Sequence, residues 1–155
     1  MKDEPSITAA LLASGRSVRV TPHGNSMLPL LDGKMDSVVV NPLRGSPKRG
    51  DLALYREPGG ELVLHRITRV YAEKGVCDVR GDGNLGLEKV PIACMYGVAG
   101  RICRKGREFS VRHPLYLAYV WGWSHSRRFR KKLLKLYQKY QKRISRKKTG
   151  GQFYE

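Results

Sequence analysis

Residues 61–71 read ELVLHRITRVY, and this stretch decides the fold class. Apolar and β-branched residues alternate with polar ones over most of it, which is typical of a strand with one face toward a core. Side chains two positions apart in a strand share a face, so His65 lies on the same face as Val63 and Ile67. The sequence therefore predicts a long strand whose histidine points into apolar surroundings.

Shorter β-type runs lie on both sides of this strand, separated by turn signals such as GSPKRG, PGG, EKG and GDGN. They are SVRV at 17–20, DSVVVN at 36–41, DLALYR at 51–56, GVCDVR at 75–80 and VPIACMYGVAGRIC at 90–103. Several short strands at this spacing predict a mainly β domain of sandwich or barrel type. At 6–14, SITAALLAS has apolar residues on a helical period behind an N-cap serine, which predicts a short leading helix.

The composition, with 41% hydrophobic and 28% charged residues in 155, describes a soluble globular protein of one domain plus an appendage. The best candidate for a membrane span is 114–123, which falls well short of the roughly 20 residues needed. The N-terminal MKDEPS lacks the basic and then apolar layout of a secretory signal. We therefore expect a cytoplasmic protein with no signal peptide and no transmembrane helix.

The cysteines give no sign of a cofactor or a disulfide framework. Cys77, Cys94 and Cys103 form neither an even set nor a C-x-x-C pair, which also argues against a zinc knuckle. They are interpreted as small apolar strand residues. No cluster has metal-ligand spacing, so neither a metal nor an organic cofactor is expected.

The net charge of +17 is concentrated at the C-terminal end. Residues 1–103 hold 14 Lys and Arg against 11 Asp and Glu, whereas residues 104–155 hold 16 against two. From about residue 126, apolar residues recur at helical spacing among basic ones, which predicts a basic amphipathic helix. Its apolar positions are Phe129, Leu133, Leu136, Tyr137, Tyr140 and Ile144.

Three residues of the nearly neutral body have the chemistry of a nucleophilic site. Ser26 lies in the turn HGNSMLPL at 23–30, His65 lies in the long strand, and Asp82 lies in the turn RGDGN. A serine hydroxyl is a weak nucleophile until a base takes its proton, and a buried neutral histidine suits that task. An acid on the second ring nitrogen then fixes the tautomer. Spacing alone does not show that the three meet.

Five sequence boxes occur in a fixed order: GNSMLP, G-x-x-D-x-V-V-V from Gly33, KRGDLALY, VLHRITRV and VRGDGN. This series, spanning residues 15–103, resembles the signal peptidases and self-cleaving repressors that form the S24/S26 serine peptidases. The resemblance implies a signal-peptidase/LexA-like β-sheet catalytic domain at 17–112. An N-terminal helix at 1–16 would precede it, and an aromatic and basic helical tail at 113–155 would follow.

The resemblance also implies roles for individual residues. Ser26 would be the nucleophile, with Met27 packed beneath it. His65 holds the place of the general-base lysine of bacterial signal peptidases, as in the endoplasmic-reticulum and archaeal branch. Asp82 matches that branch's G-D-N-N turn, and either Asp82 or Glu88 would orient His65, with Asp82 favoured.

The chain departs from the family pattern at three points. Gly24 replaces a serine whose hydroxyl helps to bind the oxyanion, which leaves backbone N–H groups around Asn25 and Ser26, or the Asn25 amide, as donors. Gly83 replaces the first asparagine of the G-D-N-N turn. The membrane anchor of signal peptidases is lacking, which favours a maturation role in the cytoplasm or at the inner face of the membrane.

Two classes of function follow from these observations. The first is a serine endopeptidase that cleaves a precursor peptide or protein through an acyl-enzyme. The second is an inactive module of the same fold that binds a peptide or a membrane surface. Tyr116, Tyr119, Trp121 and Trp123 precede the basic helix, as in segments that lie in a lipid interface, so an anionic membrane ranks above nucleic acid as partner of the tail.

Overall fold

The strand expected at 61–71 lies inside the sheet of the computed structural model, which describes residues 4–149 and the side chains of 7–144. It is β4, Leu62–Tyr71, and it pairs with β3, Leu52–Arg56, and with β5, Val76–Arg80. The other strands are β1, Val18–Val20; β2, Ser37–Pro42; β6, Glu88–Pro91; β7, Met95–Arg104; and β8, Arg107–Ser110. In the described residues these strands form one antiparallel sheet in the order β1-β2-β7-β3-β4-β5-β6, with β8 beside β7.

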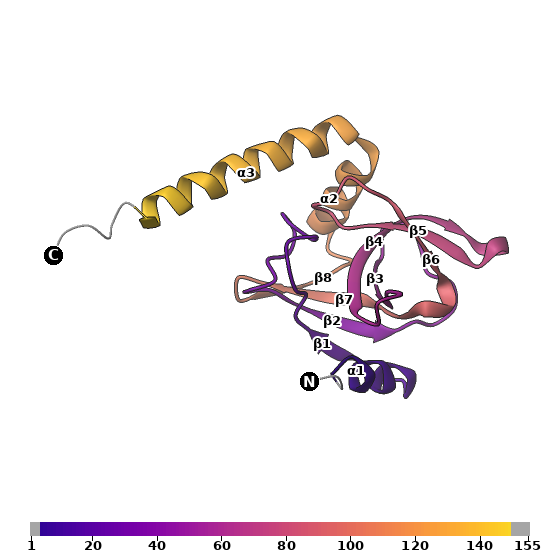
Figure 1. The fold of residues 1–155 in the computed structure, drawn as a ribbon. Helices are drawn as coiled ribbons and strands as arrows, with labels where there is room; N and C mark the ends of the chain where they lie inside the picture. The colour runs from indigo at the N-terminus through magenta and orange to yellow at the C-terminus, as the bar shows by residue number, and fades with distance from the viewer. Residues whose placement is uncertain (1–3, 150–155) are drawn as a thin grey trace.

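Helices lie at both ends of the chain (Figure 1). They are α1, Glu4–Ala13; α2, Pro114–His125; and α3, Arg127–Thr149, with short 3-10 turns η1, Ala72–Lys74, and η2, Ile92–Cys94. His113 caps α2 by accepting a hydrogen bond from the Leu115 N–H, and the Ser126 hydroxyl accepts one from the Phe129 N–H at the start of α3. Helix α3 contacts α2 and then extends away from the sheet (Figure 1).

The sheet carries an apolar cluster on each face, because successive side chains of its inner strands point to opposite sides. One cluster includes Leu52, Leu54 and Leu64 with residues of α1, α2 and the loop before β2: Leu12, Met27, Leu30, Leu31 and Tyr116. The other cluster includes Ala53, Tyr55 and Ile67 with residues of β5, β6 and β7: Cys77, Val79, Val90 and Met95. Neighbouring residues of β4 therefore belong to different environments.

The expected mainly β architecture is confirmed, as is the leading helix, with two corrections to the strands. The run at 90–103 is not one strand, because η2 divides it between β6 and β7 and places Cys94 outside the sheet. Strand β8 was not expected, since REFS is short and polar. The strands fall within 17–112 and the last two helices within 113–155; residues 1–3 and 150–155 lie outside the described residues.

The aromatic stretch of α2 packs partly on the body of the domain. Tyr116 and Trp123 are buried, whereas Trp121 is 67% exposed. Burial of these two rings fixes α2 on the face of the sheet that holds Arg66, which bonds to the Tyr116 hydroxyl. Of the helices in the described part of the chain, none has both the length and the apolar character needed to cross a bilayer.

The loop between β1 and β2 is anchored at its far end by Asp36, a buried carboxylate. One oxygen accepts a hydrogen bond from the Asp32 N–H at 2.9 Å, and the other accepts one from the Lys105 N–H at 3.0 Å. Met27, Leu30 and Leu31 anchor the near end in the core. The loop that contains Ser26 is therefore held at both ends.

We predict that Asp36→Ala lowers the free energy of unfolding by about 2–4 kcal/mol, because two N–H groups lose a charged acceptor. Urea unfolding followed by circular dichroism measures this difference. The matched control is Glu73→Ala, which removes an exposed carboxylate and is expected to change stability by less than about 0.5 kcal/mol. Equal losses in the two variants would contradict the anchoring role of Asp36.

Candidate active site

Ser26 lies in the loop between β1 and β2, half-buried above the buried Met27. The Ser26 carbonyl accepts a hydrogen bond of 2.8 Å from the N–H of Gly83, in the turn that follows β5. Because Arg80 at the end of β5 pairs with Arg66 of β4, this bond brings the loop to the end of β5, beside the interior of β4. The turn that contains Ser26 and the RGDGN turn are therefore in direct contact.

The close contact between the two turns explains why glycines flank Asp82. A Cβ atom on Gly81 would lie 2.4 Å from the Ser26 carbonyl oxygen, and one on Gly83 would lie 2.8 Å from that of Asn25. Both separations are shorter than atoms tolerate, so a larger residue would push the Ser26 loop away. Gly83, which departs from the family pattern, is thus a requirement of this contact.

Several polar groups around Ser26 make no hydrogen bond among the described residues. Among the described residues, the backbone N–H groups of Asn25, Ser26 and Met27 donate no hydrogen bond, and neither does the Ser26 hydroxyl. The Asn25 side chain is exposed, whereas Met27 is buried and supports the loop. These N–H groups are therefore candidate donors to an oxyanion beside Ser26.

His65 is 4% exposed, with its Nδ1 atom 2.9 Å from the Tyr55 hydroxyl. Burial lowers the pKa of His65, and the carboxylate of Glu88 opposes that shift. The expected burial of His65 on the same face as Ile67 is therefore confirmed, and the lowered pKa favours the neutral imidazole.

The tautomer of His65 follows from the one proton of the Tyr55 hydroxyl. Tyr55 donates that proton to Glu88 Oε2 at 2.9 Å, so it accepts from His65, and Nδ1 carries the imidazole proton. Nε2 is then an unprotonated acceptor. Within the described residues Nε2 has no hydrogen-bond partner.

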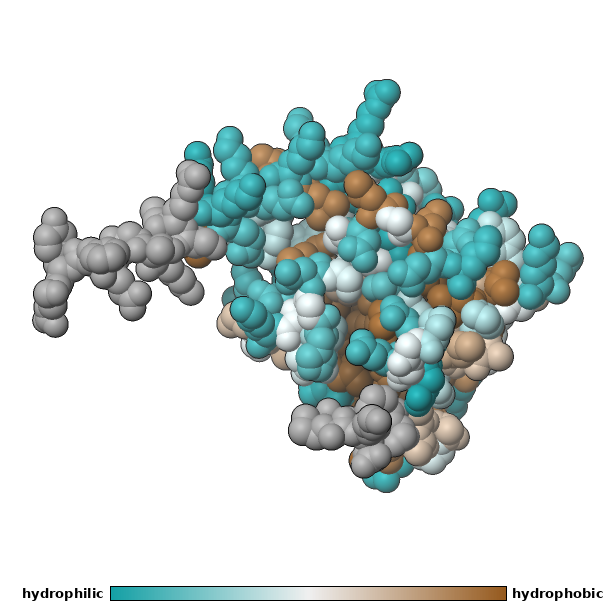
Figure 2. Space-filling view, viewed as in Figure 1, coloured by the Kyte–Doolittle hydropathy of each residue, from teal (hydrophilic) through white to brown (hydrophobic). Residues whose placement is uncertain are grey.

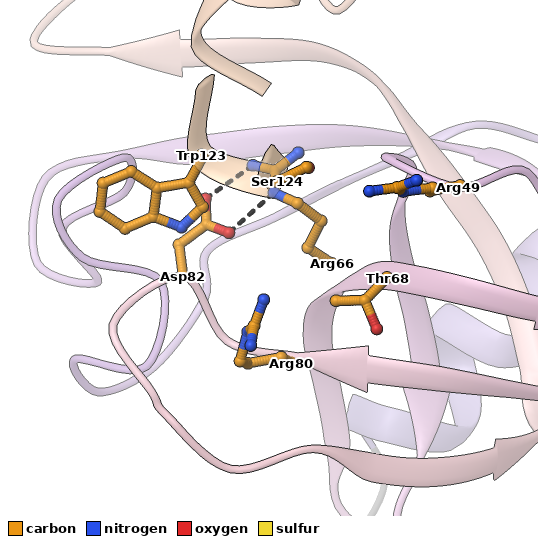
Figure 3. Close-up of a pocket in the computed structure, with 7 residues that line it drawn as sticks. All are labelled: Arg49, Arg66, Thr68, Arg80, Asp82, Trp123 and Ser124. Carbon is orange, nitrogen blue, oxygen red and sulfur yellow. Dashed lines mark hydrogen bonds and ion pairs between the residues drawn. The ribbon is translucent and has the colours of Figure 1, made fainter. Parts of the chain in front are cut away.

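The acid nearest to His65 is Glu88, whose Oε2 lies 4.0 Å from Nδ1. Asp82, which the sequence favoured for this role, bonds to other residues. Its two carboxylate oxygens accept hydrogen bonds from Arg66 at 2.7 and 2.6 Å (Figure 3). One of these oxygens also accepts a hydrogen bond from the Tyr119 hydroxyl at 3.0 Å. Strand alternation explains the difference, since Arg66 and His65 project from opposite faces of β4. Asp82 is thus a structural residue of the turn behind Ser26.

Ser26 and His65 are not bonded to each other in the described structure. Met27, next to Ser26, packs with Leu64 on one face of β4, whereas His65 lies on the other face with Ile67. Catalytic hydrogen bonds are often long without substrate and tighten when it binds. Comparisons of the chain with protein-family models, curated proteins and solved structures found no match. The interpretation of the site therefore rests on its residues and their geometry.

Sequence reasoning missed Tyr55, which joins His65 to Glu88. A signal was present, because Tyr55 alternates with Ala53 in DLALYR and so shares its face of the sheet. Pairing of β3 with β4 places Ala53 directly across from His65, which the sequence alone does not specify. Burial and the hydrogen bond to Glu88 raise the pKa of Tyr55, which keeps its hydroxyl protonated at neutral pH.

We predict that His65 titrates below its ordinary pKa of 6.5 and that Glu88→Gln lowers the midpoint further, because the carboxylate opposes the effect of burial. Histidine NMR signals followed against pH measure both midpoints. Since the folded state holds the proton less tightly than the unfolded state, stability falls as the pH drops from 6.5 toward the folded midpoint. Glu61→Gln, at an exposed site, is the control. An unchanged midpoint in Glu88→Gln would contradict the assignment.

Proposed function

We propose that the protein is a serine endopeptidase of the signal-peptidase-like S24/S26 type that cleaves a precursor peptide or protein. The observation that carries this proposal is the environment of His65: its Nδ1 bonds to the Tyr55 hydroxyl, Tyr55 in turn donates to Glu88, and Nε2 has no hydrogen-bond partner among the described residues. The Ser26 loop, whose N–H groups have no partner among the described residues, contacts the turn after β5 through the hydrogen bond from Gly83 to Ser26. The order of the sequence boxes supports the same family and its fold.

In the proposed reaction, Ser26 Oγ attacks the scissile carbonyl while His65 Nε2 takes the hydroxyl proton. Backbone N–H groups at Ser26 and its neighbours stabilise the oxyanion. The imidazolium is stabilised by Tyr55 at Nδ1 and by the nearby Glu88 carboxylate. His65 then gives the proton to the leaving amine, which yields an acyl-enzyme. A water activated by the same nitrogen releases the product.

The remaining residues of the predicted site have supporting roles in this proposal. Asn25 provides a backbone N–H and an amide near the oxyanion, and Met27 supports the loop from the core. Asp82 positions the turn after β5, because it bonds to Arg66 and the neighbouring Gly83 bonds to the Ser26 loop. Glu88 replaces Asp82 as the acid associated with His65. With Gly24 in place of a serine, the oxyanion loses one donor, which typically lowers the rate by about a hundredfold or more.

The test of this proposal is labelling by a fluorophosphonate, followed by intact-protein mass spectrometry. We expect one adduct on the wild type and on Ser46→Ala, an exposed control serine, and none on Ser26→Ala. His65→Ala is expected to slow labelling by about a hundredfold or more, because the general base is lost. Peptide-library cleavage by the same variants extends the test to turnover. Adduct formation or cleavage that persists in Ser26→Ala would contradict the proposal.

A second candidate function, binding to a membrane surface, is favoured by one feature of α3. Between Arg127 and Thr149 the helix has twelve Lys and Arg and no Asp or Glu. Its apolar side chains are not buried by the body: Phe129 is 49% exposed, Leu136 58% and Tyr140 62%. Figure 2 shows hydrophilic side chains along α3 with apolar side chains beside them. An amphipathic basic helix with an uncovered apolar face suits an anionic lipid surface.

Two single substitutions in α3 test this candidate. Leu136→Glu places a charge on the apolar face, whereas Gln138→Glu makes the same charge change on the polar face. We expect wild type to co-sediment with vesicles of phosphatidylglycerol and phosphatidylcholine. Leu136→Glu is expected to bind about tenfold more weakly than Gln138→Glu, since only the former loses burial of a leucine. Equal binding by the two variants, or equal binding to pure phosphatidylcholine, would count against the membrane surface.

A further inference from the structure

A small cavity of about 20 Å³ lies between the sheet and α2, on the face of β4 opposite His65. The lining residues come from two strands, two loops and α2 (Figure 3). They are Arg66 and Thr68 of β4, Arg80 of β5, Arg49 of the loop before β3, Asp82 of the turn after β5, and Trp123 and Ser124 of α2. Its volume is that of roughly one water-sized group. The cavity shares Arg49 and Thr68 with an open cleft of about 700 Å³ that also contains Lys48 and Arg69.

The cavity wall includes a buried donor without a partner. Trp123 is 2% exposed, and its Nε1–H makes no hydrogen bond in the described residues. Figure 3 shows the indole nitrogen on the edge of the ring that faces the other lining residues. Leaving such a donor unpaired costs about 1–3 kcal/mol, so an acceptor is expected to occupy the space beside it.

Positive charge around the cavity exceeds negative charge. Asp82 is the one carboxylate in the wall, and its two oxygens are occupied by Arg66 and Tyr119. Arg49 and Arg80 have no carboxylate partner among the described residues. Burial and the neighbouring Arg130 and Arg127 lower the pKa of Arg80, as expected where like charges are crowded. A water would satisfy Trp123 but would not offset this charge.

We propose that this cavity is a binding site for a phosphate group. One phosphate oxygen accepts from the Trp123 Nε1–H inside the cavity, and the others meet the guanidinium groups of Arg80 and Arg49 at its mouth. Arginine presents paired N–H donors that match phosphate oxygens. The substituent of a phosphate monoester would extend into the adjoining cleft, toward Lys48 and Arg69. The site is independent of Ser26, so it does not rest on peptidase activity.

The probes are inorganic phosphate and glycerol 3-phosphate, titrated calorimetrically at constant ionic strength. We expect one saturable site on the wild type and on Ser26→Ala. Arg80→Gln is expected to weaken binding by about tenfold or more, because a charge-assisted pair is lost, and Trp123→Phe by about fivefold. Phenylalanine keeps the ring packing and removes only the donor. Unfolding curves of both variants verify that the fold is retained.

Two matched controls separate this site from the general positive charge. Arg107→Gln changes an exposed cation on β8, and Lys139→Gln changes one on α3; both are expected to bind phosphate within twofold of wild type. Absence of saturable binding to the wild type would overturn the proposal. So would equal losses in Arg80→Gln and in the two controls, since that pattern indicates unspecific attraction.

The source of the phosphate is distinguished with vesicles. Phosphatidic acid presents a phosphate monoester, whereas phosphatidylglycerol presents a diester. If a lipid headgroup is the source, Arg80→Gln reduces binding to phosphatidic acid vesicles more than to phosphatidylglycerol vesicles. If the source is a soluble phosphate, the variant loses only the soluble probes and binds both vesicles as wild type does. Either pattern supports a phosphate site at Arg80 and Trp123.

Discussion

The buried ion pair between Arg66 and Asp82 is the interaction on which the candidate site depends. Both side chains are almost fully enclosed, at 3% and 1% exposure, and they are joined by two short hydrogen bonds. The third guanidinium nitrogen, Nη1, donates hydrogen bonds to the Gly50 carbonyl and to the Tyr116 hydroxyl. Two buried charges are tolerated when they are paired and hydrogen-bonded, and here each of the three guanidinium nitrogens of Arg66 has a hydrogen-bond partner. Although burial opposes it, the pair with Asp82 raises the pKa of Arg66.

This ion pair joins the parts of the chain that the proposed chemistry needs. It fixes the turn after β5, and that turn holds the Ser26 carbonyl through Gly83. It also holds α2, because Tyr116 and Tyr119 bond to the pair and their rings lie 5.8 Å from the Arg66 guanidinium. A loop that carries the proposed nucleophile would otherwise lose entropy each time it adopted a reactive geometry. The buried pair provides that order in advance.

Much of the fold was predictable from the sequence, because it depends on local periodicity and turn chemistry. The strand face of His65 and its burial followed from alternation within ELVLHRITRVY. The choice between Asp82 and Glu88 as the acid near His65 did not follow from alternation. It depends on which strand lies beside β4 and on which face of β4 each carboxylate approaches. Asp82 was favoured by its turn, but the turn meets Arg66. Glu88 is joined to His65 by hydrogen bonds through the Tyr55 hydroxyl, and the register of β3 with β4 places Tyr55 there. Long-range register of this kind is not encoded in one local pattern.

The alternation of β4 also separates two chemistries that lie one residue apart. On one face, a neutral imidazole is enclosed with a tyrosine and a half-exposed glutamate, an environment that suits proton transfer. On the other face, Arg66 begins a group of cations that continues through Arg80 to Arg127 and Arg130 at the start of α3. A charged ligand bound there would not contact the imidazole, because the sheet lies between them. The strand thus keeps this basic surface apart from the buried imidazole that we propose as the catalytic base, so the positive charge does not lower the basicity of His65 by direct contact.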